Sequence, residues 1–416
     1  MGFGQGLSGL NAASQNLDVI GNNIANSGTV GFKTGSATFA DVYASSRVGL
    51  GVQVASINQR FTTGIVSNSG NEFDIAIDGA KGLFVVTQPN GATLYTRNGQ
   101  FLADKNHNIV NAQGQQLMGY APGGTNLIGM TVPVGNIAPQ ATSEINNKVN
   151  LDADADVIDG TTNPFDPTQD SSFSKMVPLT VYDSLGNSHE VQQYYVKRGA
   201  TAGVNNWDVY VAIDGAIIDP ATGMAQTPAT PPAYTTAHQL EFDDEGRLDP
   251  ATAQYALNFQ VPVSGGAAAA DLAIAVSYAD STQFGGSYSQ DFIQDGYKTG
   301  EYASMSIGAD GSLIANYTNG AKQTMGTIAL ADFANLQGLQ PVGGNAWAET
   351  ANSGQPIVGT PGSNGLAVIR GQSVEESNVD MSQELVNMII AQRTYQANAQ
   401  TIKTQDQILQ TLITMR

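Results

Sequence analysis

The sequence contains no cysteine in its 416 residues, so it can form no disulfide and no thiolate metal or redox site. Charged residues are also scarce, at 13%, while 41% of the residues are hydrophobic. A chain of this length and composition can bury a sizeable core in two to four domains, which argues against disorder throughout.

Positive charge is in short supply, because 17 Lys and Arg stand against 36 Asp and Glu, a formal net charge of -19. This balance argues against nucleic acid or an anionic membrane as a partner. The deficit is concentrated in residues 71–371, which carry a net -18, whereas residues 1–70 and 372–416 are nearly neutral. Neutral ends that associate, with an acidic middle kept in solvent, suit a polymer whose copies meet only through chosen faces.

Catalytic and metal-binding patterns are missing. The three histidines are far apart in sequence, and we find neither a zinc-binding His pair nor a nucleophile elbow. The run Asp152 to Gly160 begins like a calcium loop, but Val157 replaces the turn glycine and Asn163 the closing glutamate, so we favour a solvated acidic loop. Phe32 breaks the order of a phosphate loop at Gly28 to Thr34. We therefore expect a protein that is not an enzyme, with no cofactor and no metal site.

Long apolar runs are absent as well. We find no transmembrane segment and no signal-peptide core near the start, where the first basic residue is Lys33. The sequence thus predicts no membrane insertion, and export, if it occurs, without a cleavable signal peptide.

Glycine and proline are missing from residues 377–416, although the chain holds 47 Gly and 16 Pro. This stretch predicts one long helix, and a second helix is predicted from the start to the stop signal at Asn26 to Gly28. Gly2, Gly4, Gly6 and Gly9 are poor helix formers, so we expect the first helix to begin late.

Both terminal helices carry narrow apolar lines at heptad spacing, which favour pairing as a coiled coil. We expect the two ends to pack against each other and against neighbouring copies, because such helices are marginal alone. The residues predicted to form this assembly interface are Phe3, Leu7, Leu10, Leu17, Ile24, Leu385, Met388, Tyr395, Ile402 and Leu409.

The rest of the chain has the alternation and turn chemistry of β-structure. Hairpins are predicted at Pro89 to Gly91, Asn98–Gly99 and Asn319–Gly320, and a turn at Asp243 to Gly246. Residues 220–232 and 265–270 are expected to be loops. The fold class is mainly β with α-helical termini: paired terminal coiled-coil helices and nested β domains of sandwich or barrel type.

The order of these patterns predicts that each domain except the outermost combines an early and a late segment of the chain. We expect a helical domain from residues 1–28 and 372–416, and a connector from 29–70 and 364–371. An inner β domain is expected from 71–144 and 290–363, and an outer β domain from 145–289. For residues 29–70 a semi-extended connector and a partly disordered linker remain equally good interpretations.

The two ends also carry motifs. Residues 17–33 read LDVIGNNIANSGTVGFK, and residues 379–409 read VDMSQELVNMIIAQRTYQANAQTIKTQDQIL. Both resemble the terminal signatures of the flagellar rod and hook axial protein family, closely over about residues 1–120 and 290–416 and loosely over 145–289. The long central insertion is similar to that of the hook members. The family motif residues are Asn22, Asn23, Asn26, Gly31, Phe32 and Lys33.

The resemblance implies a structural subunit of the bacterial hook, a helical homopolymer that acts as a universal joint and transmits torque from motor to filament. It also implies an extracellular location, type III export, and as partners a hook cap, a hook-length ruler, distal rod proteins and hook-filament junction proteins. A distal rod-type axial protein is the alternative within the family, and a β-rich adhesin the alternative outside it.

Uncharged polar residues gather along the last helix, where a solvent-facing surface would carry Glu and Lys. We expect them to line a lumen through which unfolded chains pass; bonding across subunits is the alternative. These residues are Gln392, Gln396, Asn398, Gln400, Thr404, Gln407, Gln410 and Thr411.

Overall fold

A computed structural model describes residues 2–42, 49–200, 203–219, 222–226, 234, 237–261 and 269–414. The chain forms two compact units. The terminal unit comprises Met1–Val134, Ala303–Asn316 and Lys322–Arg416, and the outer unit comprises Gly135–Tyr302 and Tyr317–Ala321. Most of the predicted loops at 220–232 and 265–270 lie outside the described residues.

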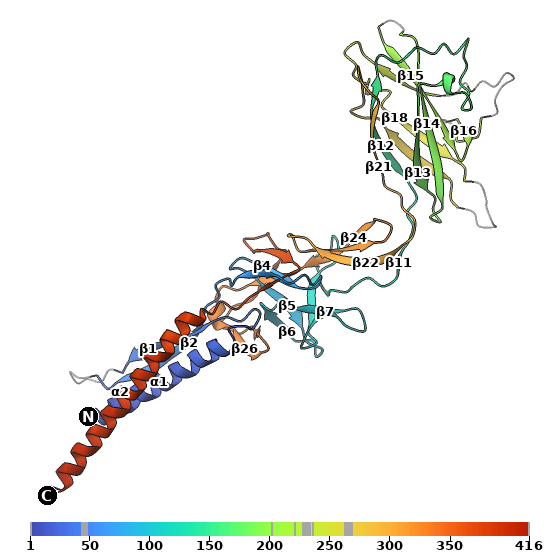
Figure 1. The fold of residues 1–416 in the computed structure, drawn as a ribbon. Coiled ribbons are helices and arrows are strands. Elements are labelled where there is room, and N and C mark those ends of the chain that lie inside the picture. Colours follow the sequence, from blue (N-terminus) through green and yellow to red (C-terminus); the bar gives the residue numbers. More distant parts are fainter. Residues whose placement is uncertain are drawn as a thin grey trace. The chain divides into compact units, whose positions relative to one another are not determined.

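Two antiparallel helices, α1 (Gly2–Ala25) and α2 (Met381–Thr414), run side by side in the terminal unit (Figure 1). The predicted long C-terminal helix is confirmed, but it begins at Met381 rather than near Ser377. Asp380 ends the preceding extended segment and caps the helix, since its Oδ1 accepts the Gln383 amide hydrogen at 3.1 Å.

The expectation of a late start for α1 was wrong, because the helix begins at Gly2. Tertiary packing overrides the poor helix propensity of its glycines. A Cβ on Gly6 would lie 3.0 Å from Cγ1 of Ile402, and one on Gly9 would lie 2.9 Å from the Asn398 side chain. Glycine therefore lets α2 approach the α1 backbone closely, and the contact offsets the cost in propensity.

The segment after α1 contains ordered strands. β1 (Gly35–Asp41) and β2 (Val52–Gln59) form an antiparallel hairpin that packs on α1. β3 (Val66–Asn68) pairs with β30 (Ser373–Glu375), and β4 (Ile75–Asp78) pairs with β29 (Val368–Gly371). Each of the last two pairs joins an early part of the chain to a late one, so the chain ends return to one place.

The main sheet of the terminal unit runs in the order β24-β9-β5-β6-β27-β26, and β22 and β23 continue it beyond β24. It packs a core that includes Leu83, Tyr95, Phe333 and Trp347. The strand bounds are β5 (Leu83–Thr87), β6 (Thr93–Thr96), β7 (Phe101–Ala103), β8 (Ile109–Asn111), β9 (Gln116–Tyr120), β10 (Leu127–Gly129), β22 (Gly300–Ile307), β23 (Ser312–Tyr317), β24 (Lys322–Ile328), β25 (Leu330–Asp332), β26 (Gln340–Gly343), β27 (Ala346–Ala348) and β28 (Ile357–Gly359).

Two of the predicted hairpins are confirmed: β5 pairs with β6 around Pro89 to Gly91, and β23 with β24 around Asn319–Gly320. The hairpin at Asn98–Gly99 was wrong, because β7 pairs with β8 and not with β6. Gly99 serves a close backbone approach instead: its carbonyl accepts the Ile75 amide hydrogen at 2.9 Å, and a Cβ would collide with the Ile75 carbonyl oxygen.

The outer unit is a sandwich of two five-stranded sheets, which confirms the predicted class. One sheet runs β13-β14-β15-β16, with β17 also on β15; the other runs β18-β19-β12-β20, with β21 on the far edge of β12. The bounds are β11 (Asn136–Ile137), β12 (Glu144–Asp152), β13 (Lys175–Tyr182), β14 (Ser188–Lys197), β15 (Asn205–Ile213), β16 (Ala216–Ile218), β17 (His238–Phe242), β18 (Gln254–Phe259), β19 (Leu272–Ser277), β20 (Thr282–Phe284) and β21 (Ser289–Gln294).

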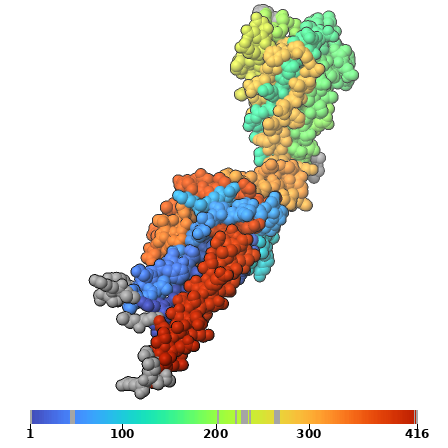
Figure 2. Space-filling view, turned by 60° about the vertical axis from the view of Figure 1, so that its left-hand side comes forward, coloured from blue at the N-terminus to red at the C-terminus, as the bar shows by residue number. Residues whose placement is uncertain are grey.

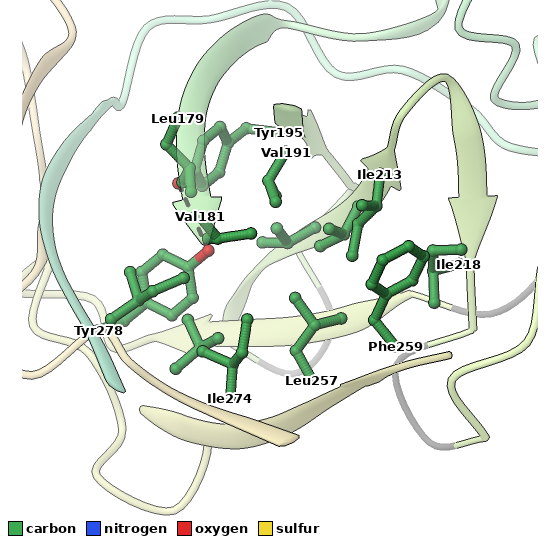
Figure 3. Packing of buried hydrophobic residues seen from close by; sticks show 14 of the residues in the cluster. Leu179, Val181, Val191, Tyr195, Ile213, Ile218, Leu257, Phe259, Ile274 and Tyr278 are labelled. Atoms are coloured by element: carbon green, nitrogen blue, oxygen red, sulfur yellow. Dashed lines mark hydrogen bonds between the residues drawn. The ribbon is translucent and has the colours of Figure 1, made fainter. Parts of the chain in front are cut away.

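Side chains from the two sheets meet in one core, where Val181, Val191 and Ile213 of the first sheet face Leu257 and Ile274 of the second (Figure 3). Inward-facing residues alternate with more exposed ones along β13, β18 and β19. The predicted turn at Asp243 to Gly246 is confirmed, since the Gly246 amide donates to the Asp243 carbonyl.

Removing apolar volume from this core should destabilise the outer unit. Ile274→Ala should lower the free energy of unfolding by about 2–5 kcal/mol, because the side chain is fully buried and leaves a cavity. Urea unfolding followed by Trp207 fluorescence, in a Trp347→Phe background, measures the change.

Ile293→Ala in β21 is the matched control, because that isoleucine is 69% exposed; its effect should stay within about 0.5 kcal/mol. Equal losses in the two variants would contradict the packing described here.

Candidate functional site: the terminal helices and the junction at their base

Small residues form the contact between the two helices. Ala12, Ala13 and Ile20 of α1 and Ala391 of α2 are buried, and Ile402 lies against Gly6. The buried face of α1 is thus centred on small side chains beside the predicted heptad line, because glycine and alanine allow the closer approach.

The predicted assembly residues lie mostly outside this contact. Leu10, Leu17, Ile24, Met388 and Ile402 are half-buried in the single chain, and Phe3, Leu7, Leu385, Tyr395 and Leu409 are exposed. Of the ten, Ile402 faces the partner helix at Gly6.

The outer surface of α2 carries further apolar side chains. In Figure 2 this helix, in red, forms an open ridge along the terminal unit. Its exposed large apolar residues include Met381, Val386, Ile389, Ile390, Ile408 and Ile413. These residues form two groups, one near each end of α2, and exposed apolar groups of this kind are typical of an interaction surface.

Asn398 was wrongly grouped with the uncharged residues of the outer face of α2, since its side chain packs against Gly9 of α1. Gln392, Gln396, Gln400, Thr404, Gln407, Gln410 and Thr411 are exposed on α2, as the lumen expectation requires.

A buried cluster of charges lies where the helices join the β-structure. The carboxylate of Glu375, at the end of β30, accepts a hydrogen bond from Lys33 Nζ at 2.6 Å and one from Arg97 Nη1 at 2.9 Å. It also accepts the Gly64 amide hydrogen at 2.8 Å, and Lys33 Nζ donates to the Thr62 carbonyl at 2.8 Å. One carboxylate thus joins three separate segments of the chain.

The three side chains are withdrawn from water, with exposures of 0% for Lys33 and Glu375 and 1% for Arg97. Burial lowers the pKa of the Lys33 ammonium below its ordinary value; the attraction and hydrogen bond of Glu375 oppose this effect, and the charge of Arg97 adds to it. Because two cations share one anion, the cluster depends on the Glu375 carboxylate remaining in place.

Glycine at position 31 is required for this packing. Gly31 has φ +72°, and a Cβ there would lie 2.6 Å from the backbone carbon of Arg97. Its amide donates to the Glu375 carbonyl at 2.8 Å, so the backbone itself also connects the N-terminal motif to β30.

The asparagines of the motif hold the end of α1. Asn23, buried in the structure, exchanges two hydrogen bonds with the backbone of Gly35, donating at 2.8 Å and accepting at 2.9 Å. Asn26 Nδ2 donates to the carbonyl and to the side-chain oxygen of Asn22. Phe32 is half-buried and lines a cleft of about 320 Å³ between α1 and β2.

Asn378 fixes the segment that leads into α2. Its Oδ1 accepts the amide hydrogen of Thr34 at 2.8 Å and the hydroxyl of Thr34 at 2.6 Å. Its Nδ2 donates to the carbonyl of Arg60 at 2.7 Å and to the carbonyl and hydroxyl of Thr62 at 3.2 and 3.0 Å. A single side chain therefore holds the two segments that flank the β1–β2 hairpin.

Sequence reasoning found Lys33 only as a motif residue and missed Glu375, Arg97 and Asn378. Glu375 is 342 residues from Lys33 and 278 residues from Arg97, so no local sequence pattern indicates these contacts. The one available sign was the charge of Lys33, since residues 19–32 before it carry none and a buried charge needs a partner.

No group of three or more His, Asp or Glu residues that could hold a metal occurs in the described part of the chain. Of the histidines, His189 Nδ1 lies 2.6 Å from Asp214 and His238 Nε2 lies 2.7 Å from the Thr252 carbonyl. Within the described ranges, none of the helices is long and apolar enough to cross a bilayer.

Four family models match successive parts of the chain. They are the flagella basal body rod protein over residues 5–33 and the flagellar hook protein FlgE/F/G D1 domain over 76–158. The flagellar basal body protein FlaE D2 domain matches residues 150–297, and the flagellar basal body rod FlgEFG protein C-terminal model matches 370–415.

Whole-chain relatives agree with these models. The chain is 42% identical to the flagellar hook protein FlgE of Salmonella typhimurium and 43% identical to that of Escherichia coli K12, over the full length of both chains in each case. It is 31% identical to FlgE of Borreliella burgdorferi over 99% of this chain and 98% of the relative. The crystal structure of Helicobacter pylori flagellar hook protein FlgE2 has a TM-score of 0.53 at 16% identity, covering 74% of this chain and all of that one, which is a likeness in fold.

Neutralising the central carboxylate should cost stability. Glu375→Gln leaves Lys33 and Arg97 buried without a counter-ion, so the terminal unit should lose about 3–5 kcal/mol of unfolding free energy. Urea unfolding followed by the fluorescence of Trp347, in a Trp207→Phe background, reports on this unit.

The neighbouring Glu376 is exposed, so Glu376→Gln removes the same charge and should leave stability nearly unchanged. If the two variants unfolded at the same urea concentration, the cluster would not have the role described.

Proposed function

Because this chain belongs to the family of flagellar hook proteins and is a subunit of the flagellar hook, we propose that it polymerises into a flexible helical tube that transmits torque from motor to filament. The supporting observation is the apolar surface left open on α1 and α2. Burial of that surface against neighbouring copies provides the driving force for association, since each Å² removed from water contributes roughly 25 cal/mol.

The ten apolar residues predicted from the heptads are proposed as part of this assembly interface. Five are exposed and five half-buried in the single chain, so each has surface left to lose on polymerisation. The pairing within one chain uses small residues together with Ile402, so the exposed larger side chains remain available for contacts between copies.

We assign the layers of the tube from the same argument. Residues 1–28 and 372–416 form its inner wall, 29–70 and 364–371 the connector, 71–144 and 290–363 the inner β domain, and 145–289 the outer β domain. The acidic charge of the middle of the chain favours polar, replaceable contacts in the outer layers, which suits a joint that bends while it rotates.

The proposed function also sets the partners. We assign the subunit to the part of the flagellum outside the cell, reached through the type III export apparatus. Hook cap, length ruler, distal rod and hook-filament junction proteins are its proposed partners besides its own copies. The family is one of structural proteins, and no catalytic role is proposed.

Polar substitution of the open helix surface should prevent polymerisation. Leu385→Ser combined with Ile389→Ser removes two side chains that are 45% and 50% exposed, so the single chain should fold with unchanged circular dichroism. Tube formation, scored by electron microscopy of cell-surface hooks, should be lost.

Ile293→Ser is the control, because it removes an isoleucine that is 69% exposed and belongs to the outer unit. Normal tubes from the double variant would argue that the helix surface has another role.

Additional positive charge among the exposed glutamines of α2, on either side of Lys403, should hinder passage through the tube. Gln400→Lys and Gln407→Lys should leave hooks intact but shorten the filaments that grow beyond them, because a charged lumen holds a passing unfolded chain. Filament length on cells is the measurement, with Gln400→Asn and Gln407→Asn as uncharged controls. Filaments of normal length in the Lys variants would contradict the lumen assignment.

A further inference from the structure

The junction at the base of the helices connects every chain segment that passes between the helices and the β-structure. Glu375 contacts Lys33 after α1, Gly64 before β3 and Arg97 after β6. Arg97 in turn donates from Nη2 to the carbonyls of Gly79 and Ala80, at 3.0 and 2.8 Å. The carboxylate therefore links the roots of both helices to the body of the main sheet.

The helices themselves are held to this junction by directional contacts. Asn378 lies three residues before α2. Its side chain forms hydrogen bonds with Thr34, the residue after Lys33, and with Thr62, whose carbonyl also accepts a hydrogen bond from Lys33. Asn23, within the last turn of α1, is paired with the backbone of Gly35. Each helix thus enters the junction through a buried or half-buried asparagine rather than through a free linker.

Charge-assisted hydrogen bonds restrict the relative movement of the segments that they join more than apolar contacts do. Apolar surfaces slide with little change in buried area, whereas a carboxylate bound by Lys33, Arg97 and Gly64 holds only one arrangement. Moving the helix roots by a few Å would leave two cations at 0–1% exposure without their anion, and such a state is strongly disfavoured.

We propose that the cluster of Lys33, Arg97, Glu375 and Asn378 is a rigid junction that fixes the direction of the α1–α2 pair on the terminal β-structure already in the single subunit. Bending of the polymer is then taken up outside this junction. The first part of this inference, the fixed direction of the helix pair, concerns the subunit before assembly. The second part, the location of bending, rests on the proposed function.

A stabilising cluster without a directional role is the competing explanation. The ion pair between Arg370 and Asp78 supplies the comparison, because it joins β29 to β4 at 2.8 Å in the same unit but is 59% and 42% exposed. Its contribution is small and its geometry is free to relax in water.

Amide hydrogen exchange on the soluble, unpolymerised chain tests the first part. Gly31 and Gly64 donate their amide hydrogens to Glu375, so both should exchange at least about 100-fold more slowly than an unstructured peptide before any tube forms. Protection that arises only in assembled tubes would overturn the proposal, because the junction would then be a product of assembly.

Replacement of the cluster by apolar side chains tests the second part. The triple variant Lys33→Met, Arg97→Met and Glu375→Met keeps the volume of the buried cluster and removes its directional bonds. Hooks isolated from cells should keep their diameter and show a shorter persistence length in electron micrographs. Wild-type stiffness in this variant would overturn the proposal.

The double variant Arg370→Met and Asp78→Asn is the control and should leave stiffness unchanged.

If the triple variant does not fold, Glu375→Asp gives the second measurement. Its shorter side chain cannot reach both cations, so it should speed amide exchange at Gly64, while Gly31, bound through the backbone, stays protected. Unchanged exchange at Gly64 would also count against the junction. Absence of tubes from the unaltered chain would instead refute the proposed function and leave the exchange result to stand.

Discussion

The buried carboxylate of Glu375 is the contact on which the terminal unit depends. It neutralises Lys33, which precedes β1, and Arg97, which follows β6. It lies five residues before Asp380, which caps α2. A chain that leaves through α1 and returns through α2 needs a fixed meeting place, and one anion shared by two cations provides it. The small-residue contact between the helices can then follow, because their roots are already positioned.

The helices and the β-structure solve different physical problems. The β units bury their alternating apolar residues within one chain and carry most of the negative charge outward. The helices bury mainly glycine and alanine within the chain, and many of their large apolar residues stay exposed or half-buried. In a single subunit the β units therefore present a charged surface to water, while the helices keep apolar surface that other copies can cover. A self-assembling tube requires this difference between the two surfaces.

Local patterns predicted the elements well where neighbouring residues decide the structure. The turn at Pro89 to Gly91 located the hairpin of β5 and β6, since turn chemistry acts over four residues. The same reasoning failed at Asn98–Gly99, where the glycine admits the Ile75 carbonyl from 24 residues earlier, and at Gly2 to Gly9, where contact with α2 outweighs propensity. Both failures arise from contacts between residues far apart in the chain.

The sequence by itself determined the class of fold, the two terminal helices, the acidic body and the motifs that place the chain among the hook proteins, because periodicity, charge and motif spacing are all local properties. Only the tertiary structure decided which helix faces are closed and which are open. It alone also brought Glu375 to Lys33 and Arg97, since ion pairs across hundreds of residues follow from the path of the whole chain and leave no trace in the neighbourhood of any one residue.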